Sequence, residues 1–435
     1  MPPRRCAWDD APVHLHDERQ PTVSPTPDRP ARTRVLLAAL LAVALLAGAA
    51  GWWVARDDGT AADVAAGLSG APAGADFYRA DAQEIRDGEH GSLIWSREEA
   101  GTGLEGARTH LVLYRSVGAK GEPVAVSGTV TLPPGEPPEG GWPVISWGHG
   151  TTGTADTCAP SLTTLQGQAR FYTSLTQRVL DTYLQRGYVV VASDYEGLGT
   201  PGPHPYLLGE SAGRAMTDIV SAARELDDQV SGTWLAAGHS QGGQAALFTA
   251  QSVDGYAPDL DLQGIAAIAP PSQLRRALTT SIRDDLDRST FLGPLLSSAA
   301  AVAGVPRDRV FSARGVALLP QLEDRCLEGL SAQDSFGGVR TGDLVRPGVD
   351  LTPVERVVAD NDASALTPEV PVLVVQGTAD TTVPVILTDA LARQWRADDV
   401  DLTYRRVAGK GHVDVLEDAR TSVDRWLEQT APALP

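Results

Sequence analysis

TWLAAGHSQGG, residues Thr233–Gly243, is the segment from which the architecture of this chain follows. Its first five residues, Thr233–Ala237, form a short apolar run of the kind found in buried strands. The run leads directly into a G-x-S-x-G motif at 238–242, and a helix is expected at Gln244–Gln251. A strand, a sharp turn and a helix in this order place the central serine hydroxyl on an exposed, strained turn. The motif therefore predicts that Ser240 is a nucleophile.

A second G-x-S-x-G motif lies at 209–213 and centres on Ser211. Only three apolar residues, Tyr206–Leu208, stand before it, and the nearest predicted strand is Tyr188–Ser193. A parallel neighbour to that strand would need a crossover of a dozen residues or more, usually helical. The intervening segment Asp194–Pro205 is rich in Gly and Pro and cannot supply a helix. We therefore interpret Ser211 as the N-cap of a following helix.

Strand and helix patterns alternate from about residue 76 onward. Strands are expected at His110–Ser116, Pro123–Leu132, Pro143–Trp147, Tyr188–Ser193, Thr233–Ala237, Gly264–Ala269, Val372–Val375 and Leu402–Val407. Further helices are expected at Tyr172–Leu184, Ser211–Leu226 and Val415–Leu427. This alternation predicts an α/β fold with a mostly parallel sheet and helices on both faces. Between Pro271 and Thr367 no core strand is expected, and weakly helical patches such as Leu274–Ile282 predict a mainly helical cap insertion at about 271–367.

The partners of Ser240 are expected later in the chain, because folds with this serine turn order their residues as serine, acid, histidine. Asp380 follows the buried strand at 371–377, and a carboxylate just past the end of a strand lies at the sheet edge where sites form. His412 is the one histidine of the eight that comes after Asp380. Nucleophile, orienting acid and general base are thus predicted to be Ser240, Asp380 and His412.

Several acidic and histidine residues offer alternative roles. Asp380 could instead cap its turn, which would leave Asp414 as the acid, and His412 could be an ordinary loop histidine. His149 and His239 are expected to orient nearby backbone rather than to act as the base.

Backbone N–H groups for an oxyanion hole are expected from two places. Gln241 directly follows the serine at the start of a helix, where N–H groups point toward the site. The second donor is expected in the glycine-rich run 148–153, and we choose Gly150 or Thr151. Alternatively, these glycines serve only a tight turn.

Composition and charge exclude several classes of protein. The 435 residues are 42% hydrophobic, so the chain can bury a full core. With 36 basic and 55 acidic residues the net charge is −19, which argues against nucleic acid or an anionic membrane surface as main partner. Three cysteines without C-x-x-C, and no H-E-x-x-H, leave no recognisable metal site. No cofactor is expected.

The amino end predicts a membrane-targeting segment. Residues 1–34 read as a disordered cytoplasmic tail, 35–54 as an apolar transmembrane signal anchor, 55–75 as a linker, and 76–435 as the main domain. Arginines before the apolar segment place the tail inside and the main domain outside the cell membrane. Alternatively, 35–54 is a signal peptide cleaved near Ala47–Ala49, and the domain is secreted.

The predicted position of the main domain outside the cell membrane determines which cysteines can form a disulfide. Cys6 stays on the cytoplasmic side, whereas Cys158 and Cys326 lie outside, where disulfides persist. We expect a Cys158–Cys326 bridge; the alternative is two buried, inert thiols.

Three motifs together resemble the secretory lipase family, which contains fungal lipase A-type enzymes and actinobacterial relatives. They are GHSQGG at 238–243, HGTTG with CAPS at 149–153 and 158–161, and DYEGLGTPGPHPYLLGES at 194–211. The resemblance covers roughly residues 76–430. It implies an α/β-hydrolase with a cap that hydrolyses carboxylic esters, including acylglycerols and other lipid esters, and carries over Ser240, Asp380 and His412 as the triad. It also fits a disulfide between the CAPS loop and the cap.

Other functions remain open at this level. The same triad could serve a peptidase or a thioesterase, and a membrane-tethered binding protein with a decayed site is a third reading. Acyl chain length cannot be read from the sequence, because it depends on how the cap covers the cleft.

Overall fold

The computed structural model describes residues 70–99, 104–162, 170–252 and 255–430, all of which belong to one compact unit. Within these ranges no helix combines the length and apolarity needed to cross a bilayer. The predicted tail (1–34), the predicted span (35–54) and most of the predicted linker lie outside the described residues. A short 3₁₀ helix, η1 (Gly74–Tyr78), begins two residues before the domain boundary expected at 76.

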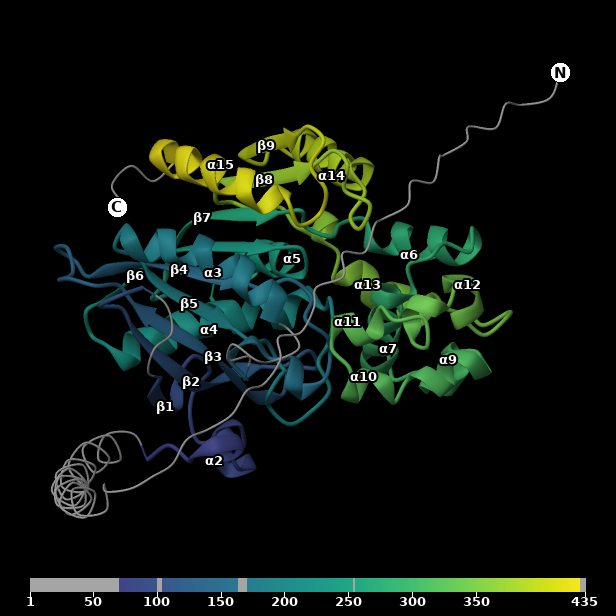
Figure 1. Cartoon of the computed structure of the whole chain (residues 1–435), viewed down its shortest axis with the longest axis horizontal. Coiled ribbons are helices and arrows are strands. Elements are labelled where there is room, and N and C mark those ends of the chain that lie inside the picture. The colour runs from purple at the N-terminus through teal and green to yellow at the C-terminus, as the bar shows by residue number, and fades with distance from the viewer. Residues whose placement is uncertain (1–69, 100–103, 163–169, 253–254, 431–435) are drawn as a thin grey trace, which may run out of the picture. The chain divides into compact units, whose positions relative to one another are not determined.

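A nine-stranded sheet forms the centre of this unit, in the order β1-β2-β3-β5-β4-β6-β7-β8-β9 (Figure 1). The strands are β1 (Leu93–Glu99), β2 (Arg108–Val117), β3 (Pro123–Leu132), β4 (Trp142–Gly148), β5 (Val189–Ser193), β6 (Val230–His239), β7 (Asp261–Ile268), β8 (Val372–Gly377) and β9 (Leu402–Val407). From β5 to β9 in that order, neighbouring strands run parallel, and the β1–β3 edge is antiparallel. The predicted α/β class with a mostly parallel sheet is confirmed.

Helices cover both faces of the sheet, as predicted. Neighbouring side chains of a strand point to opposite faces, so Val144 and Ile145 of β4 belong to two different apolar cores. Helices α4 (Gly209–Leu226), α5 (Gln241–Phe248) and α14 (Val385–Ala397) supply the core that contains Val144. Helices α3 (Arg170–Gln185) and α15 (Val415–Thr430) supply the core that contains Ile145. Burial on both faces explains why the parallel strands β4, β5 and β8 are mostly apolar.

A group of helices separates β7 from β8 in the chain. They are α6 (Leu274–Arg283), α7 (Ser289–Val302), α8 (Arg307–Val310), α9 (Ala313–Leu318), α10 (Gln321–Asp324), α11 (Leu327–Leu330), α12 (Thr341–Leu344) and α13 (Thr352–Asp360). We call this segment the insertion. Figure 1 shows it on the side of the sheet toward which the arrows of β7 and β8 point. Its apolar side chains share one core, which also takes in Tyr206 and Leu207 from the loop between β5 and α4.

Two local predictions are wrong. Ser211 is not an N-cap, because α4 begins at Gly209 and its N-cap is Leu208. Ser211 lies in the first turn, and its hydroxyl donates to the Glu196 carboxylate, which the loop after β5 brings beside it. Helix α5 begins three residues earlier than predicted, at Gln241, because the tertiary contacts of its first turn outweigh the low helix propensity of two glycines.

Candidate active site

A sharp turn carries Ser240 between β6 and α5. Ser240 has φ 57°, a left-handed conformation that is unusual for a residue with a side chain. The turn is possible because neighbouring backbones approach very closely. A Cβ on Gly242 would lie 1.9 Å from the carbonyl oxygen of Gly148, and one on Gly238 would lie 2.1 Å from that of Gly242. Glycines at 238 and 242 therefore let β4, β6 and the first turn of α5 meet beneath the serine.

Ser240, His412 and Asp380 lie in one hydrogen-bonded row. His412 Nε2 is 2.8 Å from Ser240 Oγ, and His412 Nδ1 is 2.8 Å from Asp380 Oδ2. Because a carboxylate only accepts, Nδ1 carries the proton and donates to Asp380. Nε2 is then free to accept the serine proton. In the chain, Asp380 lies 140 positions after Ser240, and His412 lies a further 32 positions on. Ser240, Asp380 and His412 follow the ends of β6, β8 and β9, respectively.

Asp380 is held as a carboxylate by four donors. Its Oδ1 accepts from the backbone N–H groups of Thr382 and Val383, each at 2.8 Å, and Oδ2 accepts from Gln376 Nε2 at 2.9 Å as well as from His412. Burial raises the pKa of Asp380, but the hydrogen bonds and the charge of His412 outweigh burial, so its pKa is lowered. The alternative acid, Asp414, accepts instead from the N–H of Gly411 at 2.7 Å.

The two histidines expected to orient backbone do contact backbone carbonyls. His239 Nε2 donates to the carbonyl oxygen of His412 at 2.8 Å, so it supports the loop that carries the base. Burial, and secondarily His412, lowers the pKa of His239 to about 3, which keeps its ring neutral. His149 Nδ1 donates to the carbonyl oxygen of Gly150 at 2.7 Å.

The two predicted sources of oxyanion donors lie side by side. Gln241 is the first residue of α5, so its N–H has no partner within the helix. The first turn of α5 touches the start of the loop after β4, since a Cβ on Gly242 would lie 2.7 Å from the carbonyl oxygen of His149. Farther along this loop, the Thr151 hydroxyl lies 2.8 Å from the Tyr206 hydroxyl. We call residues 148–158 the oxyanion loop, because an oxyanion donor is expected at Gly150 or Thr151 within them.

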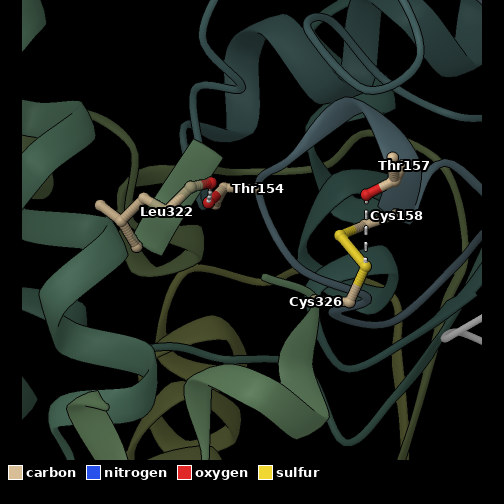
Figure 2. Close-up of a disulfide and its surroundings, with 5 residues drawn as sticks. All are labelled: Thr154, Thr157, Cys158, Leu322 and Cys326. Atoms are coloured by element: carbon tan, nitrogen blue, oxygen red, sulfur yellow. Dashed lines mark hydrogen bonds between the residues drawn. A yellow bond between two sulfur atoms is a disulfide. The ribbon is translucent and has the colours of Figure 1, made fainter. Parts of the chain in front are cut away.

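A disulfide and several hydrogen bonds attach the oxyanion loop to the insertion, and Figure 2 shows the disulfide with the contacts of Thr154 and Thr157. Cys158 and Cys326 form a disulfide across 168 residues of sequence. The N–H of Leu327 donates to the carbonyl oxygen of Thr152 at 2.8 Å. The Thr154 hydroxyl donates to the carbonyl oxygen of Leu322 at 2.6 Å (Figure 2). The insertion is therefore joined to the loop expected to complete the site.

The described residues around the serine hold no metal cluster, and a cavity in the same unit lies apart from the serine. Within the described ranges, no three His, Cys, Asp or Glu side chains gather as a metal site. A cavity of about 390 Å³ lies between α3 and the sheet, where Trp147, His149 and Asp194 contribute to its wall. Ser240, Asp380 and His412 do not line this cavity, so it is separate from the row.

Several polar side chains that contact the triad residues or the expected oxyanion donors were not predicted from the sequence. Gln376 had a detectable signal, because it is a polar residue one position before the end of the otherwise apolar strand β8. His204 and Tyr206 lie in the motif 194–211, but nothing in the sequence pairs them with Gln241 or Thr151.

Known proteins share both the sequence pattern and the fold. The family model described as secretory lipase matches residues 165–430. A probable inactive lipase of Mycobacterium tuberculosis (strain CDC 1551 / Oshkosh) is 29% identical over 331 residues, 73% of this chain and 72% of that protein. Lipase A of Arthroderma benhamiae is 26% identical over 351 residues, 74% of this chain and 70% of that protein.

A solved structure matches at the level of the fold. The rice cell wall degrading esterase LipA from Xanthomonas oryzae superposes with a TM-score of 0.67 at 20% identity, over 80% of this chain and 100% of that one. The resemblance expected from the motifs is thus confirmed. This chain belongs to the secretory lipase family, and it is a carboxylic ester hydrolase with the α/β-hydrolase fold.

Proposed function

We propose that Ser240, His412 and Asp380 are a catalytic triad that hydrolyses carboxylic esters of lipids through an acyl-enzyme. The observation that carries this proposal is the row of two 2.8 Å contacts from Ser240 Oγ through His412 to Asp380 Oδ2. His412 Nε2 takes the serine proton as Ser240 Oγ attacks the ester carbonyl carbon. Asp380 holds the imidazole in the tautomer that can accept this proton and stabilises the imidazolium that forms.

The tetrahedral intermediate carries its negative charge on the former carbonyl oxygen. We assign the N–H of Gln241 and an N–H of Gly150 or Thr151 as the donors that stabilise it. His412 then protonates the departing alcohol oxygen, which leaves the acyl group bonded to Ser240. Water, deprotonated by His412, attacks this ester and releases the carboxylic acid and free Ser240.

Hydrolysis of p-nitrophenyl esters from acetate to palmitate by the full chain tests this proposal. Ser240→Ala should lower kcat by about 10⁴-fold or more. Ser211→Ala, in the other G-x-S-x-G motif, is the matched control and should stay within about threefold of the native kcat, because the Ser211 hydroxyl donates to Glu196, which is not a triad residue. Substantial activity in Ser240→Ala would contradict the triad.

The same assay, extended to a thioester and a peptide substrate, separates the alternative functions. A rise in kcat/KM toward long acyl chains supports a lipase, and an optimum at short chains supports a general esterase. Activity confined to thioesters or peptides would favour the thioesterase or peptidase reading. Absence of activity with every substrate class would favour a decayed site. This outcome belongs in the test because the Mycobacterium tuberculosis relative is described as a probable inactive lipase.

We further propose that the catalytic domain lies outside the cell membrane, anchored by residues 35–54 or released after cleavage near Ala47–Ala49. Membership of a secretory family and the Cys158–Cys326 disulfide support the extracytoplasmic side. Protease treatment of intact cells, followed by separation of membrane and medium, tests the location. Digestion of the domain on cells indicates an anchored enzyme, recovery in the medium indicates a cleaved one, and protection inside cells contradicts the proposal.

A further inference from the structure

We propose that His204 and Tyr206 are positioning residues that hold the two sides of the oxyanion hole and couple them to the insertion. Both belong to the loop between β5 and α4, which the triad does not use. His204 contacts the side chain of Gln241, and Tyr206 contacts the side chain of Thr151. This inference rests on the proposed function, because it concerns the donors assigned to the oxyanion.

The His204 ring fixes the side chain of Gln241 in one orientation. His204 Nδ1 is 2.7 Å from the carbonyl oxygen of Glu196, which can only accept, so Nδ1 carries the proton. Burial lowers the pKa of His204 to about 4, and the ring is therefore neutral near pH 7. Nε2 is then an acceptor, and Gln241 Nε2, at 2.9 Å, donates to it. The proton position on His204 thus determines which end of the amide faces the ring.

Gln241 depends on this contact for its place in the fold. Its side chain is buried, at 2% exposure, and its Oε1 has no hydrogen-bond partner among the described residues. Loss of the His204 acceptor would leave both ends of a buried amide unpaired, a state that proteins avoid. We expect the side chain to move in that case, together with the backbone N–H of the same residue at the start of α5.

Tyr206 holds the opposite side of the oxyanion hole. Its hydroxyl lies 2.8 Å from Thr151 Oγ1, and the residue is buried at 2% exposure. Tyr206 packs in the apolar core of the insertion with residues such as Leu295 and Phe336. The side chain therefore extends from that core to the oxyanion loop, next to the expected N–H donors.

A single hydroxyl of the insertion binds the backbone of both residues. Ser298 Oγ, on α7, accepts from the N–H of Tyr206 at 3.0 Å and donates to the carbonyl oxygen of His204 at 3.3 Å. The ring of Tyr195 stacks on His149 of the oxyanion loop, with centroids 4.4 Å apart, and lies nearly parallel to the His204 ring at 6.2 Å. The loop after β5 thus joins α5, the oxyanion loop and α7 in one hydrogen-bonded frame.

Such a frame should act on the transition state more than on the bound substrate. Oxyanion donors stabilise a charge that develops only during reaction, and they work when preorganised at hydrogen-bond distance from it. A small displacement of either donor therefore lowers kcat and leaves KM nearly unchanged.

Steady-state hydrolysis of p-nitrophenyl butyrate by the full chain tests this with two matched variants. Tyr206→Phe removes the hydroxyl that faces Thr151. Tyr114→Phe removes an equally buried hydroxyl that bonds Ser193 Oγ at 2.6 Å and the Ala215 carbonyl oxygen at 2.9 Å. We expect about a tenfold fall in kcat for Tyr206→Phe with KM within about twofold, and a kcat within about twofold of native for Tyr114→Phe. Equal kcat values in the two variants would contradict the inference.

A double-mutant cycle tests the Tyr206–Thr151 contact itself. Thr151→Val keeps the backbone N–H and removes the hydroxyl, and it should reduce kcat by a factor similar to that of Tyr206→Phe. The double variant should be no worse than the poorer single variant, because both remove the same contact. Affinity for a trifluoromethyl ketone, which forms a tetrahedral oxyanion adduct with serine, should fall in parallel with kcat/KM. Additive losses, or unchanged affinity, would count against the assigned role.

His204 is tested by rescue. His204→Phe keeps a ring without the acceptor and should lower kcat about tenfold or more, whereas His204→Gln offers an amide oxygen to Gln241 and should recover part of that loss. Native kcat in both Tyr206→Phe and His204→Phe, with Ser240→Ala inactive, overturns this inference and leaves the proposed function intact. Retained activity in Ser240→Ala overturns both.

Discussion

The Asp380 carboxylate oxygen that faces His412 also accepts a hydrogen bond from Gln376 Nε2, at 2.9 Å. Gln376 Oε1 in turn accepts from the Thr388 hydroxyl on α14, also at 2.9 Å. The acid is therefore held from three sides: by its own turn, by the end of β8 and through α14. This support fixes the carboxylate plane and, with it, the orientation of His412.

Gln376→Leu should weaken catalysis without removing any triad member. A hydrogen bond to a charged group is worth about 1.5–3 kcal/mol, so kcat should fall about tenfold or more. Thr388→Val removes only the outer contact to Gln376 and leaves the Gln376–Asp380 contact in place, so it should lower kcat less than Gln376→Leu does, by less than about threefold. Parallel kcat and thermal-unfolding measurements on both variants check this; a native kcat in Gln376→Leu would show that Asp380 does not need the amide.

Asp194 should make the fold less stable as the pH rises. Burial raises its pKa to about 6, despite the opposing hydrogen bonds from Ser161 and Ser127. The folded state therefore retains a proton between about pH 4 and pH 6 that the unfolded state releases, and this group's contribution to the unfolding free energy declines through that window. The decline amounts to about 3 kcal/mol at most, because each pKa unit corresponds to about 1.4 kcal/mol.

Asp194→Asn should remove that part of the pH dependence. Urea unfolding of both proteins at several pH values between 4 and 7.5 measures this pH dependence. As the pH rises, the unfolding free energy of the native protein should fall relative to that of Asp194→Asn. Identical pH profiles in the two proteins would mean that Asp194 titrates normally.

Removal of the Cys158–Cys326 disulfide should lower the stability of the domain and loosen the oxyanion loop. Bridges that close long loops typically contribute about 2–5 kcal/mol in secreted domains. The double variant Cys158→Ala/Cys326→Ala should therefore unfold at a lower temperature and lose kcat, since the covalent link between the loop and the insertion is gone and hydrogen bonds such as those of Thr152 and Thr154 are left to hold them together. Cys6→Ala, at the third cysteine, is the control and should keep the native Tm. An unchanged Tm in the double variant would contradict the structural role of the bridge.

Local pattern was enough to predict most of the sheet. The bounds of β3 and β9 match the predicted ranges: β3 is rich in apolar and β-branched residues, and in β9 the strand formers Thr403, Tyr404 and Val407 outweigh two arginines. β1 was not predicted, since its sequence LIWSREE ends in charged residues and its side chains are only half-buried. α14 was also missed, although its position directly after the Asp380 turn is what brings Thr388 to Gln376.

The order of residues along the chain was enough to predict the triad, but not the side chains that support the expected oxyanion donors. Ser240, Asp380 and His412 follow from a serine turn, a strand end and a single late histidine. The contacts of His204 with Gln241 and of Tyr206 with Thr151 join residues 37 and 55 positions apart. Such pairs depend on how the loop after β5 folds back over α5, which no local periodicity encodes.

Mass spectrometry of the full chain after reaction with a fluorophosphonate tests the central claim most directly. Such a reagent forms a covalent adduct with a serine only when a base activates its hydroxyl. The triad predicts one adduct, on the peptide that contains Ser240, and its loss in both Ser240→Ala and His412→Ala. An adduct on Ser211, or none on a folded protein, would contradict it.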